Sequence, residues 1–411
     1  MIKQKMLTPE EAQQIVLEHI RPIGIERVPL LDSLDRLVAE DILATYDNPP
    51  FDNSAMDGFA VRHQDVKTST PDSPSSLEMV EDIPAGSIGQ KTVGPGQTSR
   101  IMTGAPIPSG ADTVIRVEDT RTEDNRIDIL EPDDFAANIR RSGEDMKQGE
   151  VLIESGTELG PGELGVIAAV QRSFVSVHRR PTATILSTGD ELVEIDEPLQ
   201  PGKIVNSNTA SLAALASAHG ANPVMLPIAP DDEGKIRQTI ESALSGDFIL
   251  SSGGVSVGEF DFIKSVLNNM GAKEILWRVA MKPGKPLYYC IINETPYFGL
   301  PGNPVSSVMS FLQFVRPAIR KASGYRPKEL FLPTATACME NGEENDGDRR
   351  QYLRARLHYK NGQLRAQTRY RAQGSHMLTS MLGANGIVVL DPEQSVASGD
   401  LVNVQIIGKV L

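Results

Sequence analysis

A glycine-rich loop in the middle of the chain has the composition of an anion-binding site. Residues 251–258 read SSGGVSVG and follow the apolar run 248–251. Glycines let backbone N–H groups come close to a phosphate or another oxyanion, and the start of the helix that follows adds partial positive charge. The loop is not the Walker pattern GxxxxGK[ST], and no GxGxxG follows a strand. A glycine-rich structural turn is the alternative, but the position after a strand favours an anion site.

Three other loops carry groups that suit the same kind of ligand. Residues 187–191, STGDE, place two carboxylates after a strand, a pattern typical of metal or ribose binding and also of an ordinary helix start. Residues 282–286, KPGKP, hold two lysines on a stiff turn, as an oxyanion site requires, although exposed lysines in a turn look the same. Residues 299–306, GLPGNPVS, restrict the backbone with two prolines and open another helix.

Carboxylates near these loops could hold a hard cation. Asp231 and Asp232 follow the run 224–228, Asp261 follows the glycine-rich loop, and Glu191 belongs to the STGDE loop. Oxygen ligands suit Mg²⁺, which would bridge phosphate oxygens. Each carboxylate taken alone is better explained as a helix cap. Their joint position at strand ends nevertheless predicts a magnesium site.

One segment is strongly basic. Residues 349–371 contain eight Lys or Arg and no Asp or Glu, in a chain whose formal net charge is -14. Two interpretations stay open: strands that present these charges to solvent, or a phosphate-binding surface.

The composition excludes several classes of protein. The chain has 411 residues and a sequence pI near 5.0, which disfavours general nucleic-acid binding. No apolar run approaches the roughly 18 to 20 residues that a membrane helix needs, and Pro9, Glu10 and Glu11 stand where a signal peptide would be apolar. The two cysteines form no CxxC, and the six histidines show no HxH or HExxH spacing. We therefore expect a cytoplasmic protein with no affinity for nucleic acid or membranes.

The loops need a framework that brings them together, and the hydrophobic pattern predicts one. Apolar runs at 183–187, 224–228, 248–251 and 275–279 alternate with helical patterns at 209–219, 233–244, 261–270 and 305–321. This alternation is typical of an α/β domain with a mainly parallel sheet, in which ligands bind at the carboxyl ends of the strands.

The rest of the chain has a different pattern. Thr8, followed by Pro9 and Glu11, predicts a capped helix start, and a second helical stretch is expected at about 32–40. Residues 48–149 are rich in Pro, Gly, Ser and Thr with short alternating runs, and short alternating strands return after residue 327. The expected fold class is therefore α/β plus β, with a β-rich inserted module and a C-terminal β-barrel.

Taken together, the motifs resemble the MoeA family of molybdopterin molybdenumtransferases, which is related to the C-terminal part of gephyrin. The strings that carry the resemblance are NSAMDGFA (53–60), RIMTGAPIP (100–108), SGED (142–145), STGDEL (187–192), SSGGVSVGEFDF (251–262), MKPGKP (281–286), GLPGNPVS (299–306) and QGSHMLTSM (373–381). They occur in order across nearly the whole chain.

The resemblance implies insertion of molybdenum from molybdate into adenylyl-molybdopterin, with release of AMP, in a Mg²⁺-assisted reaction within a homodimer. It implies four domains: an elongated N-terminal domain of residues 1–47 and 146–179, an inserted β-rich domain of 48–145, a molybdopterin-binding α/β domain of 180–325 and a C-terminal β-barrel of 326–411. Further partners would be the molybdopterin adenylyltransferase and the apoenzymes that accept the cofactor. The alternatives are a gephyrin-like dimeric scaffold and a molybdopterin adenylyltransferase, which shares the α/β fold.

The resemblance also implies a set of site residues. The catalytic positions are Asp57, Thr103, Asp145, Glu191, Asp231, Asp261, Lys282 and Lys285, and Glu191, Asp231 and Asp261 would hold the metal. The substrate-binding positions are Gly253, Gly254, Ser256, Gly258, Pro301, Gly302, Asn303, Pro304, Ser306, Arg350 and Ser375. Asp232 is the alternative to Asp231, and Arg354 is the alternative to Arg350. Because Asp57, Thr103 and Asp145 fall in a separate predicted domain, we expect active sites that combine residues of both subunits.

Overall fold

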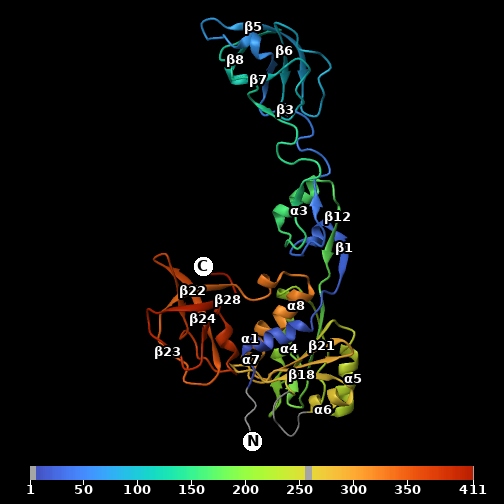
Figure 1. Ribbon diagram of the computed structural model, residues 1–411, viewed down its shortest axis with the longest axis vertical. Helices are drawn as coiled ribbons and strands as arrows, with labels where there is room; N and C mark the ends of the chain where they lie inside the picture. Colours follow the sequence, from blue (N-terminus) through green and yellow to red (C-terminus); the bar gives the residue numbers. More distant parts are fainter. Residues whose placement is uncertain (1–5, 255–261, 411) are drawn as a thin grey trace. The chain divides into compact units, whose positions relative to one another are not determined.

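The computed structural model describes residues 6–254 and 262–410. The chain divides into two compact units, whose elements are labelled in Figure 1. The first unit contains Met1–Val28, Asp35–Ala39 and Ser176–Leu411, and the second contains Pro29–Leu34 and Glu40–Val175. Among the described residues, no helix is both long enough and apolar enough to cross a membrane.

The first unit is built on a six-stranded mixed sheet. The strand order is β16 (Asn222–Met225), β13 (Thr182–Ser187), β17 (Phe248–Ser252), β21 (Thr295–Leu300), β20 (Tyr288–Ile292) and β18 (Lys273–Trp277). The first four strands are parallel, whereas β20 and β18 add antiparallel pairs. The predicted α/β domain with a mainly parallel sheet is confirmed, and the β20–β21 hairpin adds an antiparallel edge to it.

Helices cover both faces of this sheet. The helices are α1 (Pro9–Glu18), α4 (Ser207–Ala218), α5 (Glu233–Ala243), α6 (Phe262–Asn269), α7 (Pro304–Ser310), the π-helical turn η3 (Phe311–Val315) and α8 (Arg316–Ala322). One core joins α1, α4 and the α7–η3–α8 segment, and the other joins α5 and α6. Along the strands, Ile185 and Leu250 enter the first core, while their neighbours Leu186 and Ile249 enter the second. This alternation follows from the two-residue period of a strand.

The predicted cap of α1 is confirmed. The Glu11 backbone N–H donates to Thr8 Oγ1 at 3.2 Å, and the Thr8 backbone N–H donates to the Glu11 carboxylate at 2.7 Å. Both donors would otherwise lack a partner at the first turn of a helix.

The C-terminal part of the first unit is a closed β-barrel, as predicted. Its strands are β22 (Thr334–Met339), β24 (Arg350–Lys360), β25 (Gln363–Gln367), β26 (Gly386–Leu390) and β28 (Leu401–Ile406). The barrel closes because β24 pairs with both β25 and β26. The short strand β19 (Met281–Lys282) also pairs with β24, and η4 (Pro327–Glu329) and η5 (Leu378–Met381) are single 3₁₀ turns. A smaller pair joins β23 (Glu343–Glu344) to β27 (Ser395–Val396).

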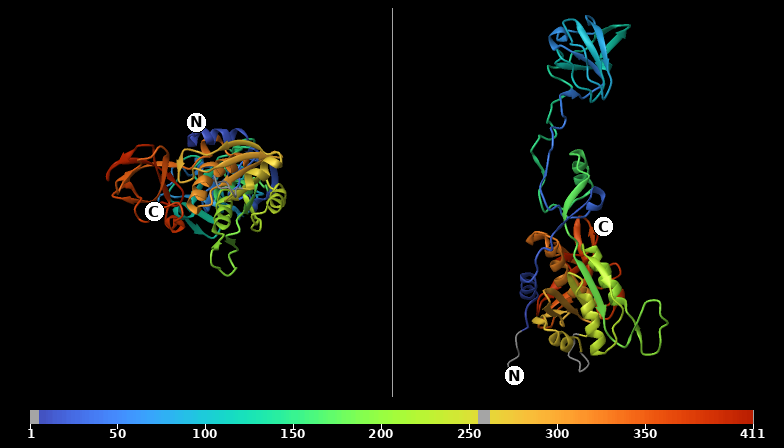
Figure 2. Two further views of the ribbon diagram at one scale, coloured as in Figure 1. Left: turned by 90° about the horizontal axis from the view of Figure 1, so that it is seen from below. Right: turned by 90° about the vertical axis from the view of Figure 1, so that its right-hand side faces the viewer.

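A short arm leaves the α/β sheet between β13 and α4. It begins with β14 (Leu192–Val193) and returns through β15 (Ile204–Val205), which pairs with β14. Figure 2 shows the intervening segment extending away from the sheet.

The second unit is β-rich, as predicted. Its main sheet has the order β7 (Thr113–Arg116), β4 (Gly58–Val61), β6 (Gln97–Ile101), β5 (Ser75–Ile83), β9 (Arg126–Ile129) and β8 (Thr120–Glu123). Smaller pairs are β2 (Ile42–Leu43) with β11 (Val151–Ile153) and β3 (Asn53–Ser54) with β10 (Ile139–Arg140). The helical elements are α2 (His63–Val66), α3 (Pro161–Ala169) and the short turn η2 (Val117–Asp119).

The prediction of a helix at about 32–40 is wrong. Residues Leu30–Ser33 form one 3₁₀ turn, η1, and Val38 instead makes an antiparallel bridge with Val177. The Ala39 backbone N–H donates to Ser176 O at 2.9 Å. The segment therefore lies beside β12 (Phe174–His178), which also pairs with β1 (Ile25–Pro29). Tertiary pairing outweighs the weak helix propensity of this stretch.

Candidate functional site

The carboxyl ends of three parallel strands meet at one edge of the α/β sheet. Ser187 of β13 pairs with Ser252 of β17, and Ser252 pairs with Leu300 of β21. The loops that follow these strands therefore start side by side, where ligands bind in open α/β sheets. They border a pocket of about 450 Å³.

The pocket draws its lining from four parts of the first unit: the strand ends with the loops that follow them, the arm, the start of α4, and the start of η5 with the loop before it. The lining residues are Ser187, Thr188, Glu191, Leu192, Ile204, Val205, Asn206, Ser207, Asn208, Ser252, Gly253, Gly302, Asn303, Pro304, His376 and Leu378. Five predicted site residues meet here: Glu191, Gly253, Gly302, Asn303 and Pro304.

The glycine-rich loop needs its glycines. Gly253 and Gly254 have φ angles of 89° and 66°, which L side chains rarely adopt. A Cβ atom at Gly254 would lie 2.4 Å from Ile263 Cδ1 and 3.0 Å from Thr188 Oγ1. The backbone of this loop can therefore approach a ligand and its neighbouring loop closely. The predicted residues Ser256, Gly258 and Asp261 lie outside the described residues.

Glu191 folds back over the turn that precedes it. Gly189 has a φ of 143°, and a Cβ atom there would lie 2.4 Å from Glu191 Oε2. The STGDE turn therefore requires glycine at this position in order to keep the Glu191 carboxylate at the pocket.

Asp231 lies beside the same turn. Its backbone N–H donates to Asp190 Oδ1 at 3.2 Å, and its Oδ2 accepts from the Asp190 backbone N–H at 3.4 Å. Asp232 instead caps α5, because its Oδ1 accepts from the Lys235 backbone N–H at 2.9 Å. Of the two alternatives, Asp231 is therefore the one that contacts the STGDE turn.

Within residues 6–254 and 262–410, no group of three or more His, Cys, Asp or Glu side chains is arranged to hold a metal ion. Glu191 and Asp231 come from neighbouring loops, and the third predicted ligand, Asp261, is outside these ranges. The magnesium site therefore stays a prediction.

Asn208 joins two of the strand-end loops, and the sequence analysis missed it. From the first turn of α4, its Nδ2 donates to Ser252 Oγ and to Gly302 O, each at 2.7 Å. A backbone carbonyl only accepts hydrogen bonds, so the contact with Gly302 sets the orientation of the amide. Asn208 therefore holds the loop after β17 against the loop after β21. Its place two residues after a buried cap residue, Asn206, gave no signal of this role.

Residues 373–377, which we call the QGSHM segment, reach the same site from the barrel. Ser375 O accepts from the Val305 backbone N–H at 3.1 Å, and Ser375 Oγ accepts from Asn303 Nδ2 at 3.4 Å. His376 and Leu378, which were not predicted, line the pocket. The predicted residues Pro301 and Ser306 flank these contacts: Pro301 O accepts from the Ser307 hydroxyl at 2.8 Å, and Ser306 is buried in α7.

Arg354 holds the QGSHM segment (residues 373–377) in place through hydrogen bonds. It is fully buried; its Nε donates to Ser380 Oγ at 3.1 Å and its Nη2 donates to Gly374 O at 3.2 Å. Burial lowers the pKa of Arg354 to about 10. Its Nη1 has no hydrogen-bond partner in the part of the chain that the structure describes.

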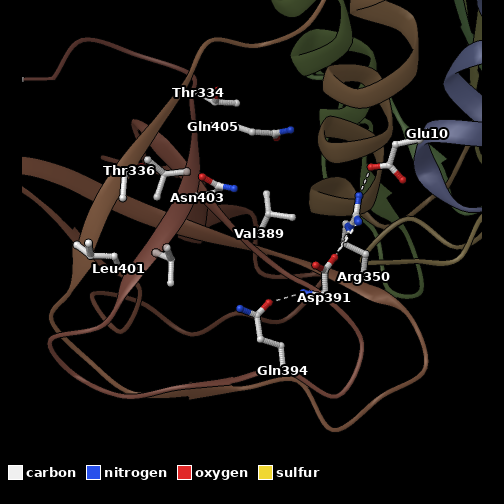
Figure 3. Close-up of a pocket in the computed structure, with 12 residues that line it drawn as sticks. Glu10, Thr334, Thr336, Arg350, Val389, Asp391, Gln394, Leu401, Asn403 and Gln405 are labelled. Atoms are coloured by element: carbon white, nitrogen blue, oxygen red, sulfur yellow. Dashed lines mark hydrogen bonds and ion pairs between the residues drawn. The ribbon is translucent and has the colours of Figure 1, made fainter.

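Arg350 lies at a different pocket, of about 500 Å³, between α1 and the barrel (Figure 3). It pairs there with Glu10 and with Asp391, to which its Nε donates at 2.8 Å. Arg350 is not among the residues that line the pocket at the strand ends. Of the two alternatives, only Arg354 contacts the segment that carries Ser375.

The basic segment 349–371 is partly paired with acidic side chains of the protein. Besides Arg350, Arg369 Nε lies 3.2 Å from Glu343 Oε1, and Arg349 Nε lies 3.7 Å from Asp348 Oδ1. Arg356 stacks on the Tyr370 ring. Both interpretations from the sequence, a solvated face and a phosphate surface, overlooked these partners.

The KPGKP turn packs on α7. A Cβ atom at Gly284 would lie 2.9 Å from Ser310 Oγ, so the turn follows the helix closely. Lys282 and Lys285 are both exposed, and neither lines the pocket at the strand ends.

The remaining predicted residues belong to the second unit. Asp57 Oδ1 accepts from the Thr103 backbone N–H at 2.7 Å and from the Thr103 hydroxyl at 2.8 Å. These two bonds, the backbone one first, lower the pKa of Asp57. Asp145 Oδ2 accepts from Asn48 Nδ2 at 2.8 Å. The structure therefore brings two of the predicted site residues, Asp57 and Thr103, together.

Replacing Asn208 with Asp should separate the two loops, because a carboxylate cannot donate to Gly302 O. We expect faster backbone amide exchange in residues 252–254 and 299–303, with an unfolding free energy lowered by about 1 to 3 kcal/mol. Hydrogen–deuterium exchange would measure this. Asn269→Asp, the same change on an exposed position of α6, should leave both loops as protected as in the unmodified protein. If the two loops were as protected from exchange in Asn208→Asp as in the unmodified protein, Asn208 would not hold them together.

Replacing Thr103 with Val removes one donor to Asp57 and keeps the side chain's shape. The pKa of Asp57 should rise toward its usual value and stay below it, since the backbone donor remains. In the unmodified protein, the stabilisation from this carboxylate is present above the unfolded pKa and is lost as the pH falls through the lower folded pKa. Carboxyl NMR titration would follow Asp57 directly. An unchanged titration curve would show that the hydroxyl contributes nothing.

Comparisons with known proteins agree across the chain. The family model described as the MoeA N-terminal region (domain I and II) matches residues 7–171, the probable molybdopterin binding domain matches 184–321, and the MoeA C-terminal region (domain IV) matches 336–407. A molybdopterin molybdenumtransferase from Nostoc is 40% identical over 89% of this chain and 84% of its own length. One from Haemophilus influenzae is 36% identical over 97% and 98%. The crystal structure of a molybdopterin biosynthesis MoeA protein from Pyrococcus horikosii superposes with a TM-score of 0.85 at 30% identity, covering 98% of this chain and 100% of that one. The resemblance seen in the sequence is confirmed, and the chain belongs to the MoeA family.

Proposed function

We propose that this chain is a transferase of molybdenum cofactor biosynthesis that inserts molybdenum from molybdate into adenylyl-molybdopterin and releases AMP. Relatives at 35% to 40% identity are named molybdopterin molybdenumtransferase. The observation that carries the proposal is the pocket where the loops after β13, β17 and β21 meet. The matched regions on both sides of the molybdopterin binding domain argue against an adenylyltransferase consisting of that domain alone.

The substrates pose an electrostatic problem. Molybdate is a dianion and the adenylyl phosphate is also negative, so the site must hold two anions close together against their repulsion. Backbone N–H groups of the glycine-rich loop would hold the phosphate. Molybdate would bind near Lys282, Lys285 and Ser306. In support, the Ser310 hydroxyl against the KPGKP turn and Arg354 Nη1 are buried donors without a partner among the described residues.

The family also implies Mg²⁺, and the donor set fits it. Glu191 and Asp231 offer only carboxylate oxygens, the ligand type that Mg²⁺ prefers, and Asp261 would be a third. When bound, the ion would neutralise phosphate charge. The chain's own residues would orient the adenylyl phosphate: the glycine-rich loop from one side and the Asn303–Ser375 contact from the other.

AMP release from purified protein tests the activity. With adenylyl-molybdopterin, we expect AMP only when molybdate and a divalent cation are both present, because each anion needs its neutralising partner. Chromatographic detection of AMP is the measurement, and omission of each component in turn is the control. AMP release at the same rate without molybdate would contradict the transfer reaction.

We further propose a homodimer whose active sites combine both chains. The pocket belongs to the first unit, whereas Asp57, Thr103 and Asp145 belong to the second. A composite site would unite them across a twofold axis.

Mixing two inactive variants tests this composite site. In a heterodimer of Asp57→Ala and Glu191→Gln, one site would carry both changes and the other would carry neither. Random exchange should then restore about a quarter of the unmodified activity. The matched control mixes Asp57→Ala with Asp145→Asn, both in the second unit, and should restore nothing. If heterodimers form without regaining activity, the site is built from a single chain.

A further inference from the structure

A second pocket, of about 540 Å³, lies at the edge of the α/β sheet where β17 and β21 begin, and we call it the amino-end pocket. Phe248, the first residue of β17, lines it together with Thr295 and Pro296 of β21. Residues 19–23, which follow α1, also line it, and Ile20 and Phe248 are buried. A pocket of this size is typical of small-molecule sites. None of the motifs that carry the family resemblance falls in this lining.

Two opposite charges line the amino-end pocket without neutralising each other. Arg21 and Glu294 are both exposed, and among the described residues the structure shows no ion pair for either of them. Arg21 Nη1 donates to two backbone carbonyls at and just after the end of α1, which hold the guanidinium but leave its charge unpaired. Asp247, a third charged residue of the lining, is already paired with Arg179 at 2.6 Å.

The turn that carries Glu294 has an unfavourable backbone conformation. Asn293 and Glu294 form the two-residue loop between β20 and β21, with φ angles of 46° and 67°. Positive φ at both positions is typical of a type I′ turn, in which glycine is strongly preferred at the second position. A residue with a Cβ atom adopts this conformation less readily than glycine does. Glutamate at this position therefore places a carboxylate at the pocket and lowers the stability of the turn.

His19 provides a further hydrogen-bond acceptor at the amino-end pocket. Its Nδ1 donates to Ile15 O at 2.9 Å, because a carbonyl oxygen only accepts hydrogen bonds. In the neutral imidazole, Nε2 is then an acceptor. The ring packs edge-on against Tyr289, which limits its movement. The lining thus combines one cation, two acceptors and buried apolar side chains.

We propose that the amino-end pocket binds a free α-amino acid with an apolar side chain. The α-carboxylate would pair with Arg21, and the α-ammonium group would donate to the Glu294 carboxylate and to His19 Nε2. The apolar side chain would lie against Ile20 and Phe248. A ligand with both charges fits best, because a simple anion would leave Glu294 unpaired and a simple cation would leave Arg21 unpaired. The site is separate from the pocket at the strand ends, so this inference does not depend on the proposed function.

Calorimetric titration of L-leucine into the full-length protein tests the site. Two analogues test the need for both charges: isocaproate, which lacks the amino group, and isoamylamine, which lacks the carboxylate. We expect leucine to bind and each analogue to bind about tenfold more weakly, because each loses one charged hydrogen bond.

The variant Glu294→Gly separates binding from stability. Glycine suits the left-handed turn, so Tm should rise, whereas loss of the carboxylate should weaken leucine binding about tenfold. Glu393→Gly is the matched control, because Glu393 is also left-handed, with a φ of 59°, and does not line the pocket. It should raise Tm and leave leucine binding unchanged. Glu294→Gln keeps the strained turn and removes only the charge, so it should weaken binding without raising Tm.

Three results would overturn the site: no binding of leucine to the unmodified protein at millimolar concentration, equally tight binding of either analogue, or unchanged leucine binding in both Glu294→Gly and Glu294→Gln. An equal loss of binding in Glu393→Gly would also contradict it, because the loss would then follow from a change in a turn outside the pocket. AMP release by the unmodified protein is measured separately, so failure of this site leaves the proposed function standing.

Discussion

The in-register pairing of three parallel strands is the constraint on which the site depends. Ser187, Ser252 and Leu300 lie in one row, and each begins a loop at the pocket. The same register places Ile185 and Leu250 in one core and Leu186 and Ile249 in the other. A slip of one residue in β17 would move its apolar side chains to the wrong faces and shift its loop along the edge. Core packing therefore positions the site.

Close approach of the loops is the second requirement. Glycine at 189, 253 and 254 provides backbone conformations and space that a side chain would remove. The Gly253 backbone N–H donates to Leu300 O at 3.1 Å, and Asn208 adds side-chain hydrogen bonds between the same two loops. Asn208 belongs to the first turn of α4. The N-terminal end of a helix also favours a nearby anion through its backbone N–H groups.

The charge that an anionic substrate meets is set by the side chains around its site and not by the net charge of the chain. The chain is acidic overall; in the barrel, Arg350 and Arg369 pair with acidic side chains and Arg354 is buried. Arg356 and Arg371 are exposed. Among the described residues, Arg354 Nη1 and the Ser310 hydroxyl are buried donors without a partner, and an anionic substrate could use them together with backbone N–H groups. Burial lowers the pKa of Arg354 to about 10, so its guanidinium still carries its charge near neutral pH.

The sequence by itself determined the elements whose signals are local. The capping box at Thr8, the alternation of strands and helices in the α/β domain and the motif order that identifies the family are all present in the residue pattern. The tertiary structure decided the rest. Residues 35–39 became a strand partner because β12 offered hydrogen bonds, and Arg354 and Arg350, four positions apart on β24, were separated by what lies against each: the Ser375 segment for one and α1 for the other. Asn208, Ile204 and His376 joined the pocket through contacts between residues distant in the chain, and such contacts depend on register and packing, which no local pattern encodes.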